Sequence, residues 1–113
     1  MSVMRIKYFL LAAFLLLTIS ASSQSYIVGT YNLRYDNPAD SGNLWTQRSS
    51  VIAQLIRFHD FDIIGTQEGL INMLEDLSDD LPEYKRYGIG RDDGKDAGEH
   101  SEIFYKKKKF KMF

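Results

Sequence analysis

Two residues with oxygen-bearing side chains each follow a short apolar segment of the sequence. Asn32 follows residues 26–31, and Glu68 follows residues 62–67. A carboxylate such as that of Glu68 is a hard oxygen ligand, the kind that Mg²⁺ and Ca²⁺ prefer. Glu68 can equally be a negative charge at the N-terminus of the next helix, where the helix dipole favours it. Taken alone, the residue type leaves both interpretations open.

Asn32 and a charged loop further along the chain offer similar alternatives. The carbonyl oxygen of Asn32 can face a metal-bound water or a phosphate, although asparagine is also a common turn residue. Arg91 can bind a phosphate oxygen, or it can belong to a solvated hairpin loop with the acidic residues beside it. Glu99 can orient a catalytic histidine, or it can be a charge that enters a strand.

The two histidines and a run of lysines have simpler interpretations. His59 falls on the apolar side of a predicted helix and is interpreted as structural, whereas His100 is expected to be exposed. The lysines at 106–109 can contact nucleic acid, but a solvated strand end or turn explains them better.

Alternating strands and helices must position these residues. Segments rich in β-branched and aromatic residues predict strands, and apolar residues at three- and four-residue spacing, including Val51, predict helices. The predicted strands are 26–31, 62–67, 84–89 and 101–105, and the predicted helices are 45–59 and 70–77, with 90–98 as a polar loop. This order favours an α/β architecture. If the first two strands are parallel, Asn32 and Glu68 lie at the carboxyl ends of neighbouring strands, where ligand sites gather.

The first 23 residues have the pattern of a secretory signal peptide. Arg5 and Lys7 precede an apolar run at 8–19, and small residues such as Ala21 and Ser23 follow it. The run is shorter than the roughly 20 residues that span a bilayer, so an uncleaved membrane anchor is the less favoured alternative. We expect cleavage after Ser23 and export of the 24–113 domain to the periplasm or medium, with membrane contact only during export.

Charge and cysteine content limit the classes of function. The chain of 113 residues has a formal net charge of −1, which gives no general attraction to nucleic acid. Any phosphate chemistry must therefore depend on a local site or a metal ion. The chain has no cysteine, so an exported form has no disulfide framework.

Taken together and in order, several segments resemble the endonuclease/exonuclease/phosphatase superfamily, which has the pancreatic deoxyribonuclease fold. The exported bacterial branch is the most similar. The segments are Thr-Tyr-Asn-Leu-Arg-Tyr-Asp-Asn at 30–37, Asp-Ile-Ile-Gly-Thr-Gln-Glu at 62–68, Gly-Ile-Gly-Arg-Asp-Asp-Gly at 88–94, and Gly-Glu-His-Ser with Ile-Phe-Tyr within 98–105. The departures include Glu102, near which members usually have proline.

The resemblance implies a role for each candidate residue. Glu68 corresponds to the metal-binding glutamate, and Asn32 to an asparagine that helps hold metal and phosphate. Arg34 corresponds to a position that approaches the substrate phosphates, and Arg91 to a substrate-binding residue of the branch's own loop. Glu99 corresponds to the carboxylate that braces the catalytic histidine.

The same resemblance implies Mg²⁺ as cofactor, with Mn²⁺ or Ca²⁺ as alternatives. The implied reaction is hydrolysis of a phosphoester in nucleic acid, a sugar phosphate or a lipid head group. The sequence indicates no protein partner.

The implied fold is the N-terminal half of a four-layer α/β sandwich, truncated after residue 113. The family's catalytic histidine and its later aspartate, asparagine and histidine residues lie in the other half. We therefore expect the fragment to be inactive alone and poorly soluble, with an exposed apolar sheet face and unpaired edges. A non-catalytic exported binding module and a non-functional gene fragment are the alternative hypotheses.

Overall fold

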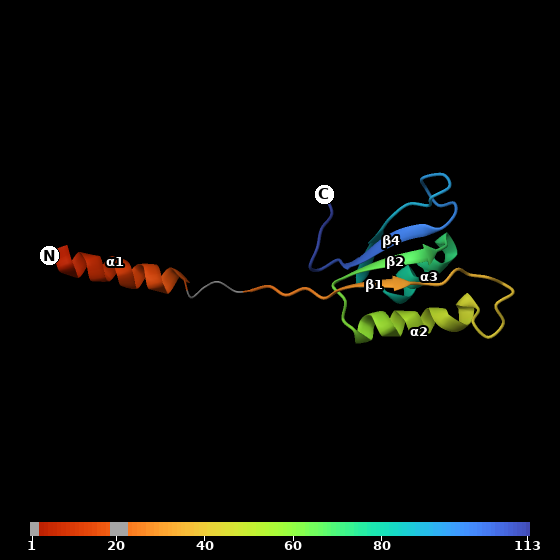
Figure 1. Ribbon diagram of the computed structural model, residues 1–113, viewed down its shortest axis with the longest axis horizontal. Coiled ribbons are helices and arrows are strands. Elements are labelled where there is room, and N and C mark those ends of the chain that lie inside the picture. The colour runs from red at the N-terminus through yellow and green to blue at the C-terminus, as the bar shows by residue number, and fades with distance from the viewer. Residues whose placement is uncertain (1–2, 19–22) are drawn as a thin grey trace.

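The computed structural model describes residues 3–18 and 23–113. Its first helix, α1 (Val3–Thr18), lies within the predicted signal peptide and stands apart from the α/β domain (Figure 1). Within the described ranges, no helix combines the length and the apolar character needed to cross a bilayer. Ala21, in the predicted cleavage region, lies outside the described residues, so processing stays a prediction.

The domain has the predicted order of strands and helices. Its elements are β1 (Val28–Asn32), α2 (Trp45–Phe58), β2 (Ile63–Gly69), α3 (Ile71–Asp80), β3 (Tyr84–Tyr87) and β4 (His100–Lys106). They form one four-stranded sheet in the order β1-β2-β4-β3. β1 and β2 are parallel, and β4 is antiparallel to both β2 and β3. The predicted α/β architecture is therefore confirmed, and the first two strands are parallel, the arrangement that places Asn32 and Glu68 at neighbouring strand ends.

Both helices of the domain pack against one face of the sheet. Alternation along the strands directs Ile64 and Phe104 into this face. The core has one continuous cluster, formed by Leu33, Trp45, Ile52, Ala53, Ile56, Ile64, Met73, Leu74, Leu77, Leu81, Tyr84 and Phe104. Burial of these apolar side chains is the main force that holds β1, β2 and β4 in register over the helices.

The opposite face of the sheet is largely uncovered. The same alternation places Ile63, Ile103 and Tyr105 on this open face, and Ile103 is 45% exposed. The C-terminal segment, with Phe110 and Met112, lines a shallow hollow beside these three residues. Among the described strands, β1 and β3 are the two edges. The expected exposed apolar face and unpaired edges are present.

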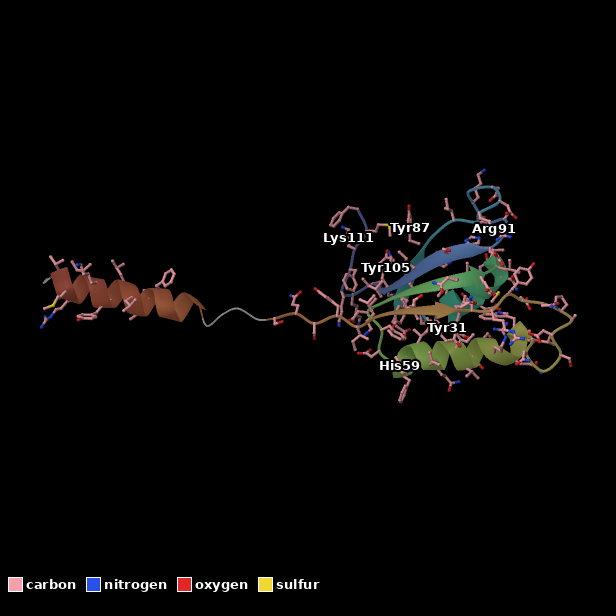
Figure 2. All side chains as sticks on the ribbon, in the orientation of Figure 1. Tyr31, His59, Tyr87, Arg91, Tyr105 and Lys111 are labelled. Atoms are coloured by element: carbon pink, nitrogen blue, oxygen red, sulfur yellow. The ribbon has the colours of Figure 1, made fainter. Side chains whose placement is uncertain are left out.

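The expected exposure of His100 was wrong, and two residues assigned to the apolar side of the predicted helix, His59 and Val51, are exposed. His59 is exposed because α2 ends at Phe58, and Asp60 then takes a left-handed conformation with φ of 52° (Figure 2). His100 is buried, since β4 begins with its side chain on the helix-covered face. Val51 is 61% exposed because the buried stripe of α2 passes through the neighbouring position instead.

The lysine run forms a turn that is fixed to the start of β2. Lys109 Nζ lies 2.6 Å from Asp62 Oδ1, and Lys106 Nζ lies 2.6 Å from Asp60 Oδ1. The Lys109 ammonium, followed by the Ile27 backbone N–H, holds the pKa of the Asp62 carboxyl well below its usual range. The outer lysines of the run therefore serve a structural role in this turn.

Candidate functional site

A β-bulge at the end of β2 sets the direction of the Glu68 side chain. Thr66 pairs with Glu102 and Gly69 pairs with His100, so β2 has one residue more than β4 between these two pairs. Glu68 takes a left-handed conformation with φ of 58°, which side-chain-bearing residues adopt infrequently. Bulges commonly redirect a side chain at a functional position. Here the bulge takes Glu68 out of the strand alternation and leaves Gly69 buried in its place.

Two uncharged donors hold the Glu68 carboxylate. Asn32 Nδ2 donates to Oε1 over 2.8 Å, and the backbone N–H of Tyr35 donates to Oε2 over 2.9 Å. The Asn32 hydrogen bond, and then the Tyr35 backbone hydrogen bond, lower the pKa of Glu68. The side chain is therefore an ionised carboxylate with a fixed orientation.

Asn32 is itself fixed by the turn that follows β1. The backbone N–H of Arg34 donates to Asn32 Oδ1 over 2.7 Å, and Arg34 has a left-handed φ of 58°. The amide nitrogen of Asn32 is thereby directed at Glu68. The parallel pairing of β1 and β2 brings these two residues together, as the sequence predicts.

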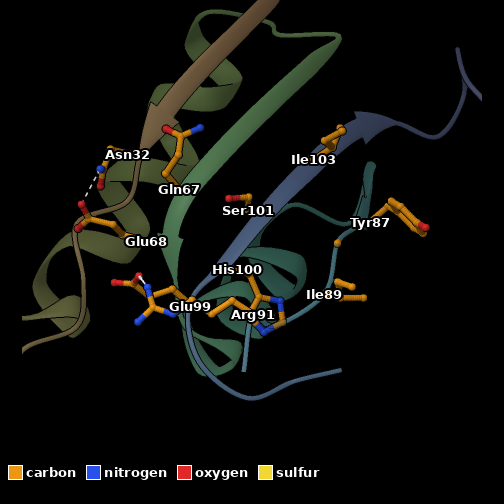
Figure 3. A pocket seen from close by; sticks show the side chains of 11 residues that line it. Asn32, Gln67, Glu68, Tyr87, Ile89, Arg91, Glu99, His100, Ser101 and Ile103 are labelled. Carbon is orange, nitrogen blue, oxygen red and sulfur yellow. Dashed lines mark hydrogen bonds and ion pairs between the residues drawn. The ribbon is translucent and has the colours of Figure 1, made fainter. Parts of the chain in front are cut away.

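Most of the candidate residues line one cleft of about 660 Å³, at the end of the sheet where β1 and β2 finish. Figure 3 shows Asn32 and Glu68 on one wall, with Arg91 and Glu99 on the loop side of β4. The lining residues are Asn32, Gln67, Glu68, Tyr87, Gly88, Ile89, Arg91, Glu99, His100, Ser101 and Ile103. The structure thus brings together residues that are up to 71 positions apart in the sequence.

Arg91 and Glu99 form an ion pair within this cleft. Arg91 Nη1 donates to Glu99 Oε2, and the Glu99 side chain is 26% exposed. The partner of Glu99 in this chain is therefore a guanidinium. The expected role in bracing a histidine stays a prediction, because the cleft's own histidine, His100, pairs with Glu102 instead.

Arg34 lies away from the cleft lining. Its guanidinium Nη2 is 2.6 Å from Asp40 Oδ2, and its side chain is 58% exposed. The backbone of Arg34 takes part in the site through Asn32, while its predicted contact with substrate phosphates stays a prediction.

Sequence reasoning overlooked a buried carboxylate beneath the cleft. The Glu102 side chain is fully buried between Arg86 Nη1, at 3.0 Å, and His100 Nδ1, at 3.1 Å. Its Oε2 atom has no hydrogen-bond partner among the described residues. Glu102 is separated by one residue from Phe104 on an apolar strand, so it shares the core-facing side. That alternation, together with Arg86 on the neighbouring strand, was the available signal.

The oxygen atoms available at Glu68 suit a divalent cation that is coordinated by few protein atoms. The described ranges contain no group of three or more acidic, histidine or cysteine side chains that could surround a metal. Mg²⁺ is commonly held by one or two carboxylates, with waters and substrate phosphate oxygens completing its shell. Glu68 offers one carboxylate of this kind, and the hydrogen bond from Asn32 orients it.

Comparison with known proteins places this geometry in a family. No family model matches the chain, and no curated protein matches it significantly. Among solved structures, an endonuclease/exonuclease/phosphatase family protein from Bacteroides thetaiotaomicron is 50% identical, with a TM-score of 0.72. The match covers 76% of this chain and 33% of that one.

Two further solved structures give the same result. A mannosyl-6-phosphatase from Bacteroides thetaiotaomicron is 53% identical over 74% of this chain and 32% of its own length, with a TM-score of 0.73. An endonuclease/exonuclease/phosphatase from Bacteroides vulgatus is 48% identical over 76% of this chain and 33% of its own length, with a TM-score of 0.75. The chain spans about a third of the length of these structures. The chain therefore belongs to the endonuclease/exonuclease/phosphatase family, and its α/β domain is the N-terminal part of that fold.

Proposed function

We propose that this domain supplies the metal-binding wall of a Mg²⁺-dependent phosphoesterase active site, with Mn²⁺ or Ca²⁺ as alternative cations. The observation that supports this proposal is the ionised Glu68 carboxylate, which lines the cleft and accepts hydrogen bonds from Asn32 and the Tyr35 amide. Its charge is balanced by hydrogen bonds from neutral groups and not by a cationic side chain in direct contact. This arrangement favours binding of a cation.

The roles of the residues follow from this arrangement. A bound divalent cation would offset the negative charge that develops on the phosphoryl oxygens during hydrolysis. Glu68 holds the cation, and Asn32 keeps the carboxylate oriented toward the cleft. Arg91, which lines the same cleft from the loop before β4, can donate to a phosphate oxygen if its guanidinium turns from Glu99.

A phosphorylated sugar is the substrate class that we favour. The support is the likeness to a mannosyl-6-phosphatase at 53% identity.

We expect the chain to be inactive on its own, because the cleft's histidine does not have a free ring nitrogen to act as a base. His100 Nδ1 faces Glu102, and its Nε2 lies 3.3 Å from the carbonyl oxygen of Asp96.

Export is the second part of the proposal. The basic start at Arg5 and Lys7 and the apolar helix α1 support a signal peptide that directs the domain to the periplasm or medium. Fractionation of cells that express the chain tests this directly. We expect mature protein outside the cytoplasm, with its N-terminus at Gln24.

Metal binding by the chain itself is the first test of the site. We expect Mn²⁺, followed by electron paramagnetic resonance, to bind the wild-type chain and to bind Glu68→Gln at least about 100-fold more weakly, because a ligand contributes more than the outer-shell groups. Glu75→Gln is the matched control, since Glu75 is exposed on α3. Equal affinity in wild type and Glu68→Gln would refute the proposed role of Glu68.

A chimaera tests catalysis. Residues 24–113 would replace the matching third of the mannosyl-6-phosphatase, and release of phosphate from mannose 6-phosphate would be measured with Mg²⁺ and with a chelator. We expect activity that requires the metal and is lost in Glu68→Gln but kept in Glu75→Gln. Full activity in the chelator would contradict the proposal.

A further inference from the structure

The guanidinium group of Arg48, on α2, binds backbone carbonyl groups of the turn after β1. Nη1 donates to the carbonyl oxygen of Leu33 over 2.5 Å, and Nη2 donates to that of Arg34 over 3.0 Å. Nε donates to the carbonyl oxygen of Asn43 over 2.6 Å, and the guanidinium lies over the Trp45 ring. Nε, Nη1 and Nη2 of Arg48 therefore all donate to backbone carbonyl groups within residues 33–43.

Arg48 binds the carbonyl oxygens of two peptide groups. The N–H groups of the same two peptide groups donate hydrogen bonds within the candidate site. The peptide between Leu33 and Arg34 gives its N–H to Asn32 Oδ1. The next peptide, between Arg34 and Tyr35, gives its N–H to Glu68 Oε2. A peptide group is planar and rigid, so fixing its carbonyl end fixes the direction of its N–H.

We propose that Arg48 is a positioning residue of the metal-binding site, because it sets both hydrogen bonds that orient the Glu68 carboxylate through these two peptide groups. One path runs directly through the Tyr35 N–H, and the other runs through the Arg34 N–H and Asn32. The inference rests on the proposed function of Glu68 as a metal ligand.

The positive charge of Arg48 lies on backbone carbonyl groups and not on the Glu68 carboxylate, and this arrangement suits cation binding. The Arg48 guanidinium polarises the two peptide groups, and this strengthens their N–H groups as donors. It does so without an ion pair to Glu68, whose oxygens accept from Asn32 and Tyr35. The carboxylate is oriented with the help of a positive charge and still keeps its own charge for a metal.

The arrangement also holds a backbone conformation that is unfavourable in isolation. Arg34 has a left-handed φ of 58°, a conformation that residues other than glycine adopt infrequently. Leu33 anchors one end of the turn, since its side chain is fully buried and its N–H donates to the Gln67 carbonyl over 2.9 Å. Lysine at position 48 would keep the charge but lacks the planar fork that reaches two carbonyl groups at once.

Amide hydrogen exchange in the full chain tests the positioning role. In Arg48→Lys we expect the Arg34 and Tyr35 amides to exchange about tenfold faster than in wild type, the effect of losing about one hydrogen bond. Arg57→Lys is the matched control, because Arg57 is on the same helix and binds Glu83 and the Asp80 carbonyl. The core amide of Ile64 corrects both variants for global stability. Equal rates at Tyr35 in the two variants would overturn the inference.

Mn²⁺ affinity gives a second measurement on the same variants. We expect about tenfold weaker binding in Arg48→Lys and wild-type binding in Arg57→Lys. In Arg48→Ala, millimolar guanidinium ion is expected to restore part of the affinity, which a general loss of stability would not allow. Unchanged affinity in Arg48→Lys would overturn the inference. If the wild-type chain binds no Mn²⁺, the proposed function of Glu68 fails, and the amide rates alone decide whether Arg48 orients the turn.

Discussion

The two walls of the cleft hold their carboxylates in different ways. On the β1–β2 wall, Glu68 accepts hydrogen bonds from the Asn32 amide and the Tyr35 backbone N–H, both uncharged. On the β4 side, Glu99 in the cleft pairs with Arg91, and Glu102, buried beneath the cleft, pairs with Arg86. The residue type is the same on both walls, and the difference lies in the charge of the donors.

This difference supports the proposed role of Glu68 as a metal ligand. Uncharged donors fix the direction of a carboxylate but leave its net charge to attract a cation. A guanidinium offsets that charge, and where the carboxylate is fully buried, as in Glu102, it needs such a partner to be tolerated. Glu68 is therefore suited to bind a cation, whereas Glu99 and Glu102 are each paired with an arginine.

The largest expected effect is loss of stability in Glu102→Ala. Removing one partner from a buried charged network costs about 3–5 kcal/mol, because Arg86 and the buried His100 lose their common acceptor. The free energy of unfolding in urea measures this effect. Glu99→Ala removes a partly exposed ion pair, for which about 1 kcal/mol or less is expected. Similar losses in both variants would remove the distinction between Glu99 and Glu102.

The next effect concerns Gly88, which makes room for the Glu102 carboxylate. A Cβ atom at Gly88 would lie 2.6 Å from both Cδ and Oε2 of Glu102. Gly88→Ala is expected to destabilise the domain by about 2 kcal/mol through overpacking. Gly65→Ala is the control on the open face, where the nearest heavy atom, Gln67 Nε2, lies 4.0 Å away. If Gly65→Ala melts as low as Gly88→Ala, close packing around Glu102 is not the cause.

A smaller effect, on metal affinity, distinguishes the two walls directly. Asn32→Ala is expected to weaken Mn²⁺ binding about tenfold, because the carboxylate of Glu68 loses the donor to its Oε1. Arg91→Ala is expected to leave the affinity close to that of wild type, since Arg91 contacts Glu99. Calorimetric titration measures both. A greater loss in Arg91→Ala would show that the β4 wall contributes to the metal site.

Much of the fold and part of the candidate site could be predicted from the sequence. Strand and helix periodicity gave the correct element order, and order alone placed Asn32 and Glu68 at adjacent strand ends. The loop that carries Arg91, and Glu99 just before β4, do reach the same cleft. These features depend on local composition and on chain connectivity, which a sequence records directly.

The missing features depend on contacts between distant residues. The bulge at Glu68 arises from the register of β2 against β4, and no local signal marks a left-handed glutamate. The burial of Glu102 requires Arg86 on the neighbouring strand, and the importance of Arg48 requires a turn folded against α2. On α2, Arg48 is simply a polar residue outside the apolar stripe. Its contacts with the carbonyl groups of Leu33 and Arg34 can be recognised only in the folded structure.

The smallest expected effect is a shift in the titration of Glu68. Its lowered pKa means that the folded structure favours the ionised form. The resulting stabilisation is present above the ordinary glutamate value of about 4.3 and is lost as the pH falls through the lower, folded value. Carboxyl ¹³C resonances report this midpoint. Asn32→Ala should raise it, because Asn32 makes the largest contribution to the lowering.

The rise in Asn32→Ala should stop short of the ordinary value. The Tyr35 N–H still donates to Oε2 in that variant and continues to favour the carboxylate. Removing Arg91 from the other wall should leave the Glu68 midpoint in place, since its guanidinium binds Glu99. If Arg91→Ala raises the midpoint as much as Asn32→Ala does, a charge from the β4 wall stabilises Glu68 after all, and the two walls act as one electrostatic unit.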